Sequence, residues 1–480
     1  MRIALTSLLL AVAAAGTAWS ITALPYYDDK SGALLPLVYV TAGLWIVFGL
    51  SIVALRAVRT RAAVVLILIG SVAIGGAAMA GPPNTSTDSA RYAWDGIVQN
   101  AGISPYDHAP ADPALADLRP EWLFPTPVVK SNGELGCTGP RIMTVKEPKT
   151  GDVLCTAINR AKVTTIYPPA SEIFFAAVRF VTGPTPQYWP MQLAGLIMSL
   201  TTTVLLLRAL VARGRDPRWA ALWGWCPLIA TEGVTNSHVD ILGAMFVFIA
   251  TLLVSTRRPT LGGIALGIAI SSKLIPVIGS FALLKRNPFK VILGSIAVFA
   301  LLYVPYILAS GIDVLGYLPG YLSEEGYTSG TRFIMISLVA PGAAALVVAG
   351  ILILMTAALT WWKSNPDDPW LAQLVMIGVT LLIVTPRYPW YALMLVPMIA
   401  MTGRWEWLAV PLALTERLLI PSVDLARLTV TLAIILIVAM TLHRAGPGAL
   451  SRLGKQIRHP FGGAKTAELR GFHSEFVTER

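Results

Sequence analysis

Two aspartates, an arginine and a tyrosine are grouped in the stretch 85–96, which reads TSTDSARYAWDG. If a helix begins at Asp88 or the residue before it, then Asp88, Arg91, Tyr92 and Asp95 share one face at spacings of three and four residues. Such a face offers two carboxylates, a cation and an aromatic ring, which suits sugar binding and acid–base chemistry. In the alternative interpretation, Asp88 caps the helix while Arg91 and Asp95 form surface pairs.

Two turn-rich stretches further along the chain carry more aromatic residues. Tyr106 lies in the stretch 102–110, which contains Gly and Pro and is by itself typical of an ordinary loop. Tyr167 precedes Pro168 and Pro169, a pair that suits the start of a helix. The segment 170–182 is too short and too charged to cross a bilayer, so we expect it to lie at the membrane interface.

Five ionisable residues fall within or beside apolar parts of the chain, where charge is costly and often functional: His238, Asp240, Lys273, Arg332 and Arg387. The His238-X-Asp240 pair could ligate a metal, but two ligands make no site. Hydrogen bonding to a sugar, or polar packing, is therefore the better interpretation. Three cations at one level of the membrane would suit a lipid-linked phosphate. Interfacial anchoring explains each of them singly about as well.

The elements that position these residues must be membrane helices, because the 480-residue chain is 55% hydrophobic and only 13% charged, with mean hydropathy +0.66. A soluble domain carries about 25% charged residues, so most soluble folds are excluded. Apolar runs of about 17 to 25 residues recur, and this length crosses a bilayer as a helix. The runs lie at about 3–24, 34–55, 62–80, 188–211, 219–232, 239–255, 260–272, 274–285, 290–309, 336–361, 369–386, 389–402, 406–421 and 426–443. We expect an all-α polytopic membrane protein with about 13 to 14 transmembrane helices.

The net charge of +11 could indicate nucleic-acid binding, but its distribution indicates membrane topology. With the N-terminus in the cytoplasm, the inner loops and the tail hold 21 of the 37 Lys and Arg residues but only seven of the 26 Asp and Glu residues. The positive excess then lies on one side, as the positive-inside rule requires. We infer a multi-pass plasma-membrane protein that is surrounded by membrane lipids, has a cytoplasmic C-terminal tail and has no nucleic-acid partner.

The chain divides into four parts: N-terminal transmembrane helices at 1–80, a polar stretch at 81–187, a transmembrane core at 188–443 and a basic tail at 444–480. The polar stretch is far longer than a connector needs, so we expect a folded extracytoplasmic loop that carries the chemistry. Cys137 and Cys155 lie in this loop, where an oxidising compartment permits a disulfide. We expect them to be bridged, with two free thiols as the alternative.

Taken in order along residues 60–400, these motifs resemble the GT-C superfamily of integral-membrane glycosyltransferases, which use polyprenyl-phosphate sugars. In particular, the chain resembles the actinobacterial polyprenol-phosphate-mannose-dependent mannosyltransferases. The resemblance rests on the order of Asp88-X-X-Arg91-Tyr92-X-Trp94-Asp95-Gly96, Gly102-X-X-Pro105-Tyr106, Thr165-Ile-Tyr167-Pro168-Pro169, Asn236-X-His238-X-Asp240, Lys273-X-X-Pro276 and Pro386–Tyr391. Two apparent helices precede the one that leads into the catalytic loop, which departs from the simplest plan of the family.

The resemblance implies an inverting glycosyltransferase that moves a sugar, expected to be mannose, from a polyprenyl-phosphate donor to a lipid-anchored glycan on the outer face. It places the catalytic base at Asp88, with Asp95 as the second candidate. The cations Lys273, Arg332 and Arg387 would stabilise the leaving phosphate. The expected sugar- or acceptor-binding residues are Arg91, Tyr92, Trp94, Tyr106, Tyr167, His238 and Asp240. No set of metal ligands is evident, so no cofactor is assigned, and dependence on a divalent metal stays open.

Two other functions are compatible with the sequence. An arabinofuranosyltransferase that uses a decaprenyl-phosphate donor would share the phosphate and the lipid and differ only at the sugar pocket. A transporter or flippase of lipid-linked sugars would favour inverted repeats and a site near the bilayer midplane. Here the polar residues cluster at one surface beneath a large loop, which favours transfer over transport.

Overall fold

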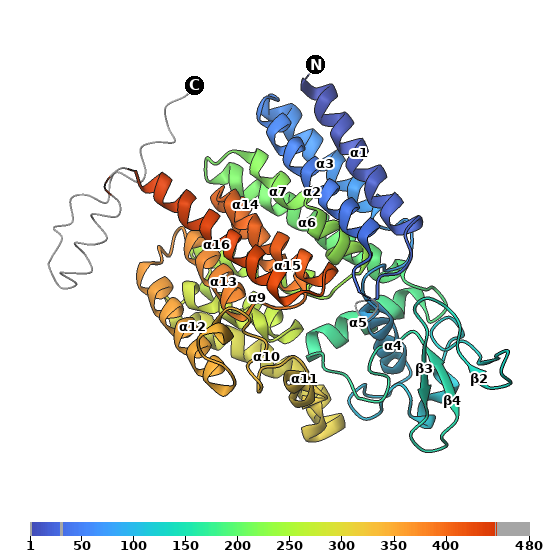
Figure 1. Ribbon diagram of the computed structural model, residues 1–480. Coiled ribbons are helices and arrows are strands. Elements are labelled where there is room, and N and C mark those ends of the chain that lie inside the picture. The colour runs from blue at the N-terminus through green and yellow to red at the C-terminus, as the bar shows by residue number, and fades with distance from the viewer. Residues whose placement is uncertain (1, 29–31, 447, 449–480) are drawn as a thin grey trace. The chain divides into compact units, whose positions relative to one another are not determined.

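The computed structural model describes residues 2–28, 32–446 and 448, and in them the chain is almost entirely helical (Figure 1). The helices of ten or more residues are α1 (Arg2–Thr22), α2 (Leu35–Arg56), α3 (Thr60–Ala77), α4 (Asp88–Asn100), α5 (Pro169–Thr182), α6 (Trp189–Ala212), α8 (Asp240–Ser255), α9 (Pro259–Ser272), α10 (Pro288–Ser310), α12 (Ala343–Lys363), α13 (Trp370–Val384), α15 (Ala409–Leu419) and α16 (Val423–Ala445). Shorter α-helices are α7 (Ala221–Gly224), α11 (Leu318–Glu324) and α14 (Val396–Thr402).

The chain divides into two units, Met1–Ala433 and Ile434–Arg480. The elements described below belong to the first unit, apart from the end of α16, which lies in the second. Of the basic tail expected at 444–480, residues 447 and 449–480 lie outside the described part of the chain.

Membrane-spanning helices define the fold class. In the described part of the chain, seven helices are long and apolar enough to cross a membrane, with Pro288–Glu324 counted as one. An eighth span exists if the π-helix η3 (Ile229–Thr235) and α8, which are bent by 114°, form one broken span. The protein is therefore an all-α polytopic membrane protein, as the sequence predicts.

The number of long spans is lower than the 13 to 14 expected. Several apolar runs fold as short or interrupted helices, such as α9 with 14 residues and α13 with 15 residues. Others form the 3₁₀ helices η4 (Ile275–Leu283) and η7 (Pro389–Met394). Hydropathy measures the length of an apolar run, but it does not show whether one continuous helix covers that run.

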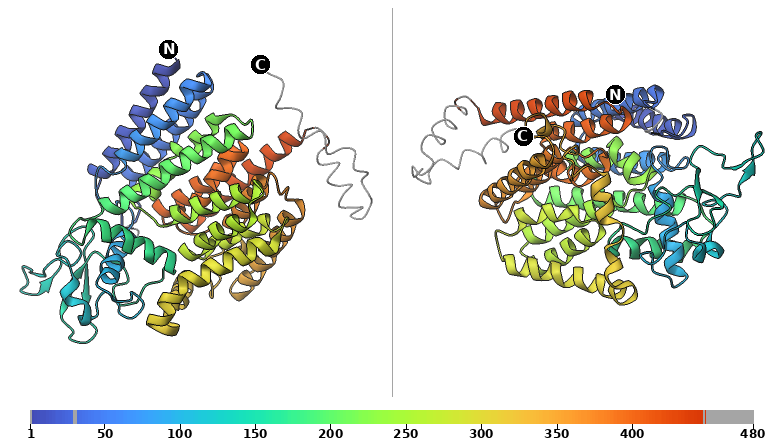
Figure 2. Two further views of the ribbon diagram at one scale, coloured as in Figure 1. Left: turned by 180° about the vertical axis from the view of Figure 1, so that it is seen from behind. Right: turned by 60° about the horizontal axis from the view of Figure 1, so that its bottom comes forward.

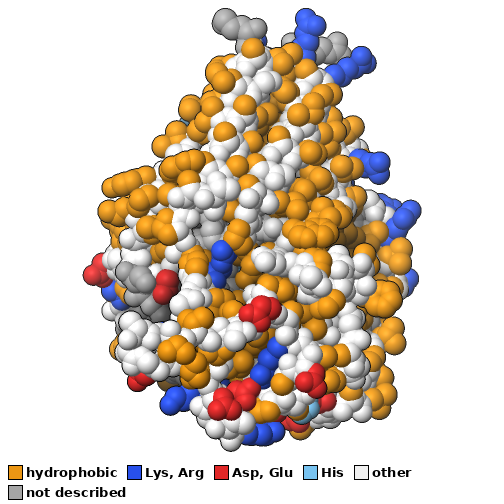
Figure 3. Space-filling model, turned by 90° about the vertical axis from the view of Figure 1, so that its right-hand side faces the viewer, with side chains coloured by type: hydrophobic (Ala, Val, Ile, Leu, Met, Phe, Trp, Pro, Cys, Tyr) orange, Lys and Arg blue, Asp and Glu red, His pale blue; other side chains and the backbone are white. Residues whose placement is uncertain are grey.

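The membrane helices expose apolar side chains on their outer surface, as contact with lipid requires. Ile46 on α2, Leu293 on α10 and Leu354 on α12 are each more than 60% exposed. Figure 3 shows hydrophobic side chains spread over the upper helices of one face, with acidic side chains gathered toward its lower end. In α8 and α13, by contrast, most side chains are buried, so these two helices form part of the interior.

Residues 81–187 form a region that we call the polar lobe. It contains α4, the 3₁₀ helix η1 (Pro113–Leu118), α5 and two small antiparallel sheets. The sheets pair β1 (Val128–Val129) with β2 (Leu135–Gly136), and β3 (Met143–Lys146) with β4 (Val153–Thr156). Both views in Figure 2 show these strands beside α4 and α5 at one end of the helical unit.

The polar lobe has its own hydrophobic core and a covalent cross-link. Ala93 and Trp94 of α4 pack against Phe124 and Ile158, which come from the segments on either side of the strands. Cys137 is joined to Cys155 of β4 in a disulfide, with 5.4 Å between the two Cα atoms. A bridge of this kind restricts the unfolded chain and so stabilises the loop that it closes.

Helices α4 and α5 cross at close range, and Gly96 makes this approach possible. A Cβ atom added at Gly96 would lie 2.4 Å from the carbonyl oxygen of Phe175. Helix α5 begins at Pro169, in agreement with the helix start expected at the Pro-Pro pair. The crossing fixes the relative position of the helices that carry Asp88, Asp95 and Glu172.

Three breaks in the membrane helices place polar residues together. Between η3 and α8, residues 236–239 are non-helical, and Ser237 adopts a left-handed conformation with φ of 48°. Helix α9 ends before Lys273, and α13 ends before Thr385, where φ is 42°. Irregular backbone is tolerated at membrane depth where protein surrounds it, because its polar groups then find partners.

Candidate active site at the start of α4

The carboxylate of Asp88 lies at the first residue of α4. The side chain does not cap the helix, because the N-cap residue is Thr87 and no side-chain capping bond is made. Asn159 donates a hydrogen bond of 2.6 Å from Nδ2 to Asp88 Oδ1, and the other oxygen, Oδ2, lies 3.7 Å from His238 Nε2. The Asp88 side chain keeps 18% of its surface exposed, so a substrate hydroxyl can approach it.

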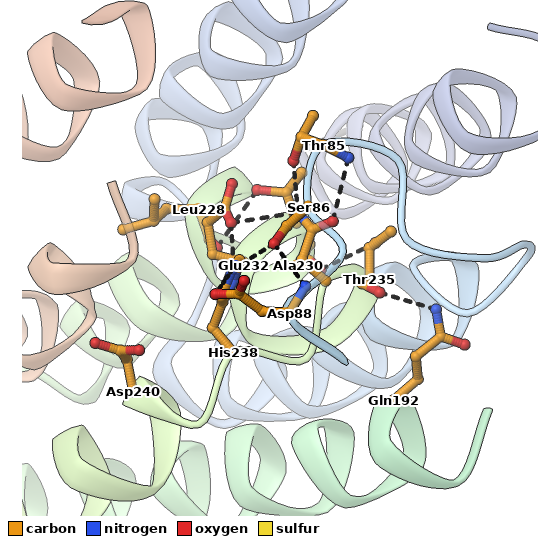
Figure 4. Close-up of polar contacts among 12 residues, drawn as sticks. Thr85, Ser86, Asp88, Gln192, Leu228, Ala230, Glu232, Thr235, His238 and Asp240 are labelled. Atoms are coloured by element: carbon orange, nitrogen blue, oxygen red, sulfur yellow. Dashed lines mark hydrogen bonds and ion pairs between the residues drawn. The ribbon is translucent and has the colours of Figure 1, made fainter. Parts of the chain in front are cut away.

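His238 is fully buried and held on three sides (Figure 4). Its Nε2 lies 3.2 Å from Ser86 Oγ, and its Nδ1 lies 3.1 Å from Glu232 Oε2. Its ring stacks on Trp390 with 3.7 Å between ring centroids. The ring is therefore fixed beside Asp88, and it contacts no open surface on which a sugar could bind.

Glu232 was not among the residues expected from the sequence. It lies in the π-helix η3, is 3% exposed, and accepts a 3.2 Å hydrogen bond from Asn236 Nδ2. Asn236 also donates to Thr85 Oγ1 at 2.7 Å, which ties the broken helix to the segment before α4. An acidic residue at the end of an apolar run, as here at the end of 219–232, is the signal that could have identified it.

Asp240 and Lys273 form an ion pair beside this group. Lys273 Nζ donates to Asp240 Oδ2 at 2.7 Å, and the two side chains are 18% and 3% exposed respectively. The charge of Asp88 also acts on Lys273. The second oxygen of Asp240, Oδ1, is buried and has no hydrogen-bond partner among the described residues.

Arg332 is connected to Lys273 through the aromatic ring of Tyr391. Lys273 Nζ lies 4.6 Å from the ring centroid, and Arg332 Cζ lies 5.8 Å from it. Arg332 also forms an ion pair with Glu325. Tyr391 was not expected as a site residue, although it lies in the aromatic stretch that follows Arg387.

Arg387 lies within electrostatic reach of Tyr388 and of Arg417. Arg417 in turn is influenced by the charge of Arg332 and donates a hydrogen bond to the carbonyl oxygen of Thr385. Arg417 is therefore a neighbour of two of the expected cations, Arg332 and Arg387. It was not among the site residues expected from the sequence. Arg387 follows the end of α13, whereas Arg417 lies in the last turn of α15.

Asp95 lies in a different environment from Asp88. Arg91 Nε donates to both carboxylate oxygens of Asp95 at 2.7 and 2.9 Å, and the two side chains are only 5% and 2% exposed. Burial raises the pKa of Asp95, while the opposing charge of Arg91 lowers it. Burial also raises the pKa of neighbouring Glu172 well above its usual range, and Glu172 accepts a 2.6 Å hydrogen bond from Thr165. The pair of Arg91 and Asp95 is thus a buried ion pair, not a surface pair.

The expected aromatic site residues divide into two groups. The hydroxyls of Tyr92 and Tyr167 are 3.5 Å apart, and the charges of Asp88 and Asp240 act on both rings. Trp94 packs against Phe124 in the core of the polar lobe. Tyr106 is buried and donates to the carbonyl oxygen of Tyr167 at 2.6 Å. The structure therefore brings Tyr92 and Tyr167 toward the Asp88 centre and uses Trp94 and Tyr106 in packing.

In the described ranges, no three His, Cys, Asp or Glu side chains are grouped closely enough to hold a metal ion. His238 contacts Glu232, whereas Asp240 forms an ion pair with Lys273.

The fold and this centre define a polytopic membrane protein whose polar groups gather where its helices are broken. Residues 165–386 match the model of glycosyltransferase family 87, one of the families of GT-C-type membrane glycosyltransferases. The match is consistent with the resemblance to the GT-C superfamily, and it supports a glycosyltransferase. The matched range contains His238, Asp240, Lys273 and Arg332, whereas Asp88 lies before it. No curated protein and no solved structure matches the chain.

Proposed function

We propose that the protein transfers a sugar, with mannose as the expected one, from a polyprenyl-phosphate donor to a hydroxyl of a lipid-anchored glycan on the outer face of the plasma membrane. One observation carries the proposal: the side chains of Asp88 and Lys273 are both partly exposed and lie within electrostatic reach of each other. An inverting transfer needs this combination, a base for the acceptor hydroxyl and a cation for the departing phosphate.

The proposed step is a single displacement at the anomeric carbon. Asp88 Oδ2 takes the proton of the acceptor hydroxyl while the acceptor oxygen forms its bond to the anomeric carbon. The bond from that carbon to the phosphate oxygen breaks, and its electron pair leaves with the polyprenyl phosphate. Because attack and departure occur on opposite sides of the carbon, the product has inverted configuration.

The cations are assigned to the leaving group. Lys273 is the first candidate, since it lies within electrostatic reach of Asp88 and its side chain is partly exposed. Arg332 and Arg387 are assigned to the same phosphate or to its approach, with Arg332 linked to Lys273 by the ring of Tyr391. Positive charge near a developing phosphate dianion stabilises the transition state more than the ground state.

The test is a transfer assay with purified protein in liposomes. Radiolabelled polyprenyl-phosphate mannose and decaprenyl-phosphate arabinose are each offered with mannolipid acceptors, so that the donor sugar is read directly. Asp88→Asn is expected to lower kcat by about 10²- to 10⁴-fold. Asp117→Asn is the matched control, because Asp117 is an exposed aspartate of the same lobe and contacts none of the site residues described above.

Full transfer by a folded Asp88→Asn protein would overturn the assignment of the base. Uptake of the labelled donor without transfer would support transport instead. Transfer from the arabinose donor alone would keep the class of reaction and change the sugar.

A further inference from the structure

Asn159 makes the shortest contact to the Asp88 carboxylate. Its Nδ2 donates to Asp88 Oδ1 at 2.6 Å, although 71 residues separate the two in the chain. The Asn159 side chain is half-buried, so the hydrogen bond is partly shielded from water. A carboxylate base has two oxygens that can accept a proton, and a hydrogen-bond donor held at this distance engages one of them.

The backbone on either side of Asn159 is firmly held. Cys155, four residues before it, is 1% exposed and bridged to Cys137. Ala157 N–H donates to the carbonyl oxygen of Leu123 at 2.9 Å. Ala157 and Ile158 are buried in the same cluster as Ala93 and Trp94 of α4. The segment that carries Asn159 is therefore packed on the helix that begins with Asp88.

Arg160 fixes the other end of this segment. It adopts a left-handed conformation with φ of 51° and pairs with Glu324 of α11 at 2.7 Å. Residues in this conformation are uncommon outside glycine and persist where the surroundings hold them. The turn at Arg160 directs the preceding Asn159 toward Asp88, and the charge of Arg160 acts on the same centre.

The second oxygen of Asp88, Oδ2, has different neighbours from Oδ1. Oδ2 lies 3.7 Å from His238 Nε2, beyond hydrogen-bond distance, while His238 is itself held by Ser86 and Glu232. The two carboxylate oxygens are therefore not equivalent. Oδ1 is occupied by Asn159, and Oδ2 is the oxygen that can accept a proton from an incoming hydroxyl.

We propose that Asn159 is a positioning residue that holds Oδ1 of Asp88 and so makes Oδ2 the proton acceptor. The inference rests on the proposed function, since it assigns a task to Asn159 only if Asp88 is the base. It also assigns a catalytic purpose to the segment that follows the disulfide-bonded Cys155, because this segment carries the amide that contacts the carboxylate.

Several titratable and charged groups face Asp88 and act on it together with Asn159. They come from α4 itself, from the polar lobe and from the broken helices: Tyr92, Arg160, Tyr167, His238, Lys273 and Tyr388. Glu232 and Asp240 lie behind them, against His238 and Lys273. All of them are unchanged in a variant at Asn159. A change in the pH dependence of such a variant therefore reports on the Asn159 contact.

The test compares Asn159→Ala and Asn159→Asp with the wild type in the liposome assay, with rates divided by the folded fraction. Asn159→Ala is expected to lower kcat by about 10- to 100-fold, because a base that is free to rotate is misaligned for much of the time. In a plot of kcat/KM against pH, the acid limb of this variant should lie at higher pH than that of the wild type. A carboxylate that loses a hydrogen-bond donor remains protonated up to a higher pH.

Asn159→Asp preserves the size of the side chain, so it remains informative if the alanine variant does not fold. It places a second carboxylate against Oδ1, and the acid limb should move further, by more than one pH unit. Asn132→Ala is the matched control, because Asn132 is an exposed asparagine in the turn between β1 and β2. It should leave both the rate and the profile unchanged.

The outcomes separate this inference from the proposed function. If Asp88→Asn is inactive while both Asn159 variants keep the wild-type kcat and acid limb, the positioning role is wrong and the base assignment stands. A loss of folded protein with an unmoved acid limb would mean that Asn159 serves folding alone, which also overturns the inference. If Asp88→Asn transfers at the wild-type rate, the base assignment fails and this inference fails with it.

Discussion

Helix α4 carries two aspartates, seven residues apart, in opposite surroundings. Asp88 at its start is 18% exposed and is contacted by the amide of Asn159 and the ring nitrogen of His238. Asp95, two turns later, is 2% exposed and is held by both of its oxygens to the guanidinium of Arg91. The first carboxylate is available to a substrate, whereas the second balances a buried charge.

The side chains around a carboxylate decide what it can do. A carboxylate with one open oxygen can accept a proton during a reaction. A carboxylate clasped by a buried guanidinium cannot do so without leaving that charge uncompensated. Helical spacing alone places Asp88 and Asp95 on one face and cannot distinguish them.

The largest effect on stability is expected from Asp95→Asn. It removes the counter-charge of buried Arg91 and should cost about 3 to 5 kcal/mol of unfolding free energy. The thermal midpoint in detergent measures this loss, with Asp88→Asn as the matched control, which should keep the wild-type midpoint. A double replacement by apolar residues, Arg91→Met with Asp95→Leu, should recover most of the stability.

The comparison would be reversed if Asp95→Asn folded normally and lost transfer while Asp88→Asn kept it. Asp95 would then be the base.

An intermediate effect is expected from Lys273, whose ion pair with Asp240 resembles the pair of Arg91 and Asp95 but is more exposed. The variant Lys273→Met with Asp240→Asn removes both charges, so that no buried carboxylate is left alone. It should raise the KM for the polyprenyl-phosphate donor by about 10- to 100-fold, since a hydrogen bond to a charged group contributes about 1.5 to 3 kcal/mol.

The KM for the acceptor should remain unchanged in the same variant. An unchanged donor KM would show that Lys273 serves only to balance Asp240, as Arg91 balances Asp95.

The smallest effect is expected from Asp112, a third carboxylate of the polar lobe that touches neither cluster. A hydrogen bond from the N–H of Ala114, then one with His108, lowers the pKa of Asp112 to about 2. Because the folded-state pKa is depressed, its contribution to stability is complete above about pH 4 and is lost as the pH falls toward 2. Asp112→Ala also removes the cap of η1 and should cost about 1 kcal/mol at neutral pH.

Thermal midpoints at pH 6 and pH 3 measure this prediction. The difference between wild type and Asp112→Ala should shrink at pH 3, with transfer activity unchanged at neutral pH. An equal difference at both values would show that the charge of Asp112 contributes nothing.

Much of the fold could be predicted from composition and local pattern. Long apolar runs gave the membrane class, α4 begins at Asp88, which was one of the two starts considered, and the Pro-Pro pair marked the start of α5. The count of spans could not be predicted, because an apolar run has the same hydropathy whether it forms one helix or a broken one. Glu232 and His238 are placed by such a break, in which η3 and α8 meet at 114°.

From the sequence it follows that the chain spans a membrane and that its polar residues gather in one long stretch and between a few apolar runs. The sequence also shows which residue types could act there. Composition and local spacing are properties of short segments, so they can be read without the fold. The tertiary structure alone decided that Asn159 meets Asp88, that Tyr391 lies between Lys273 and Arg332, and that Asp95 is sealed by Arg91. Most of these contacts join residues tens of positions apart, and even the Arg91–Asp95 pair owes its burial to the packing of α4 against α5.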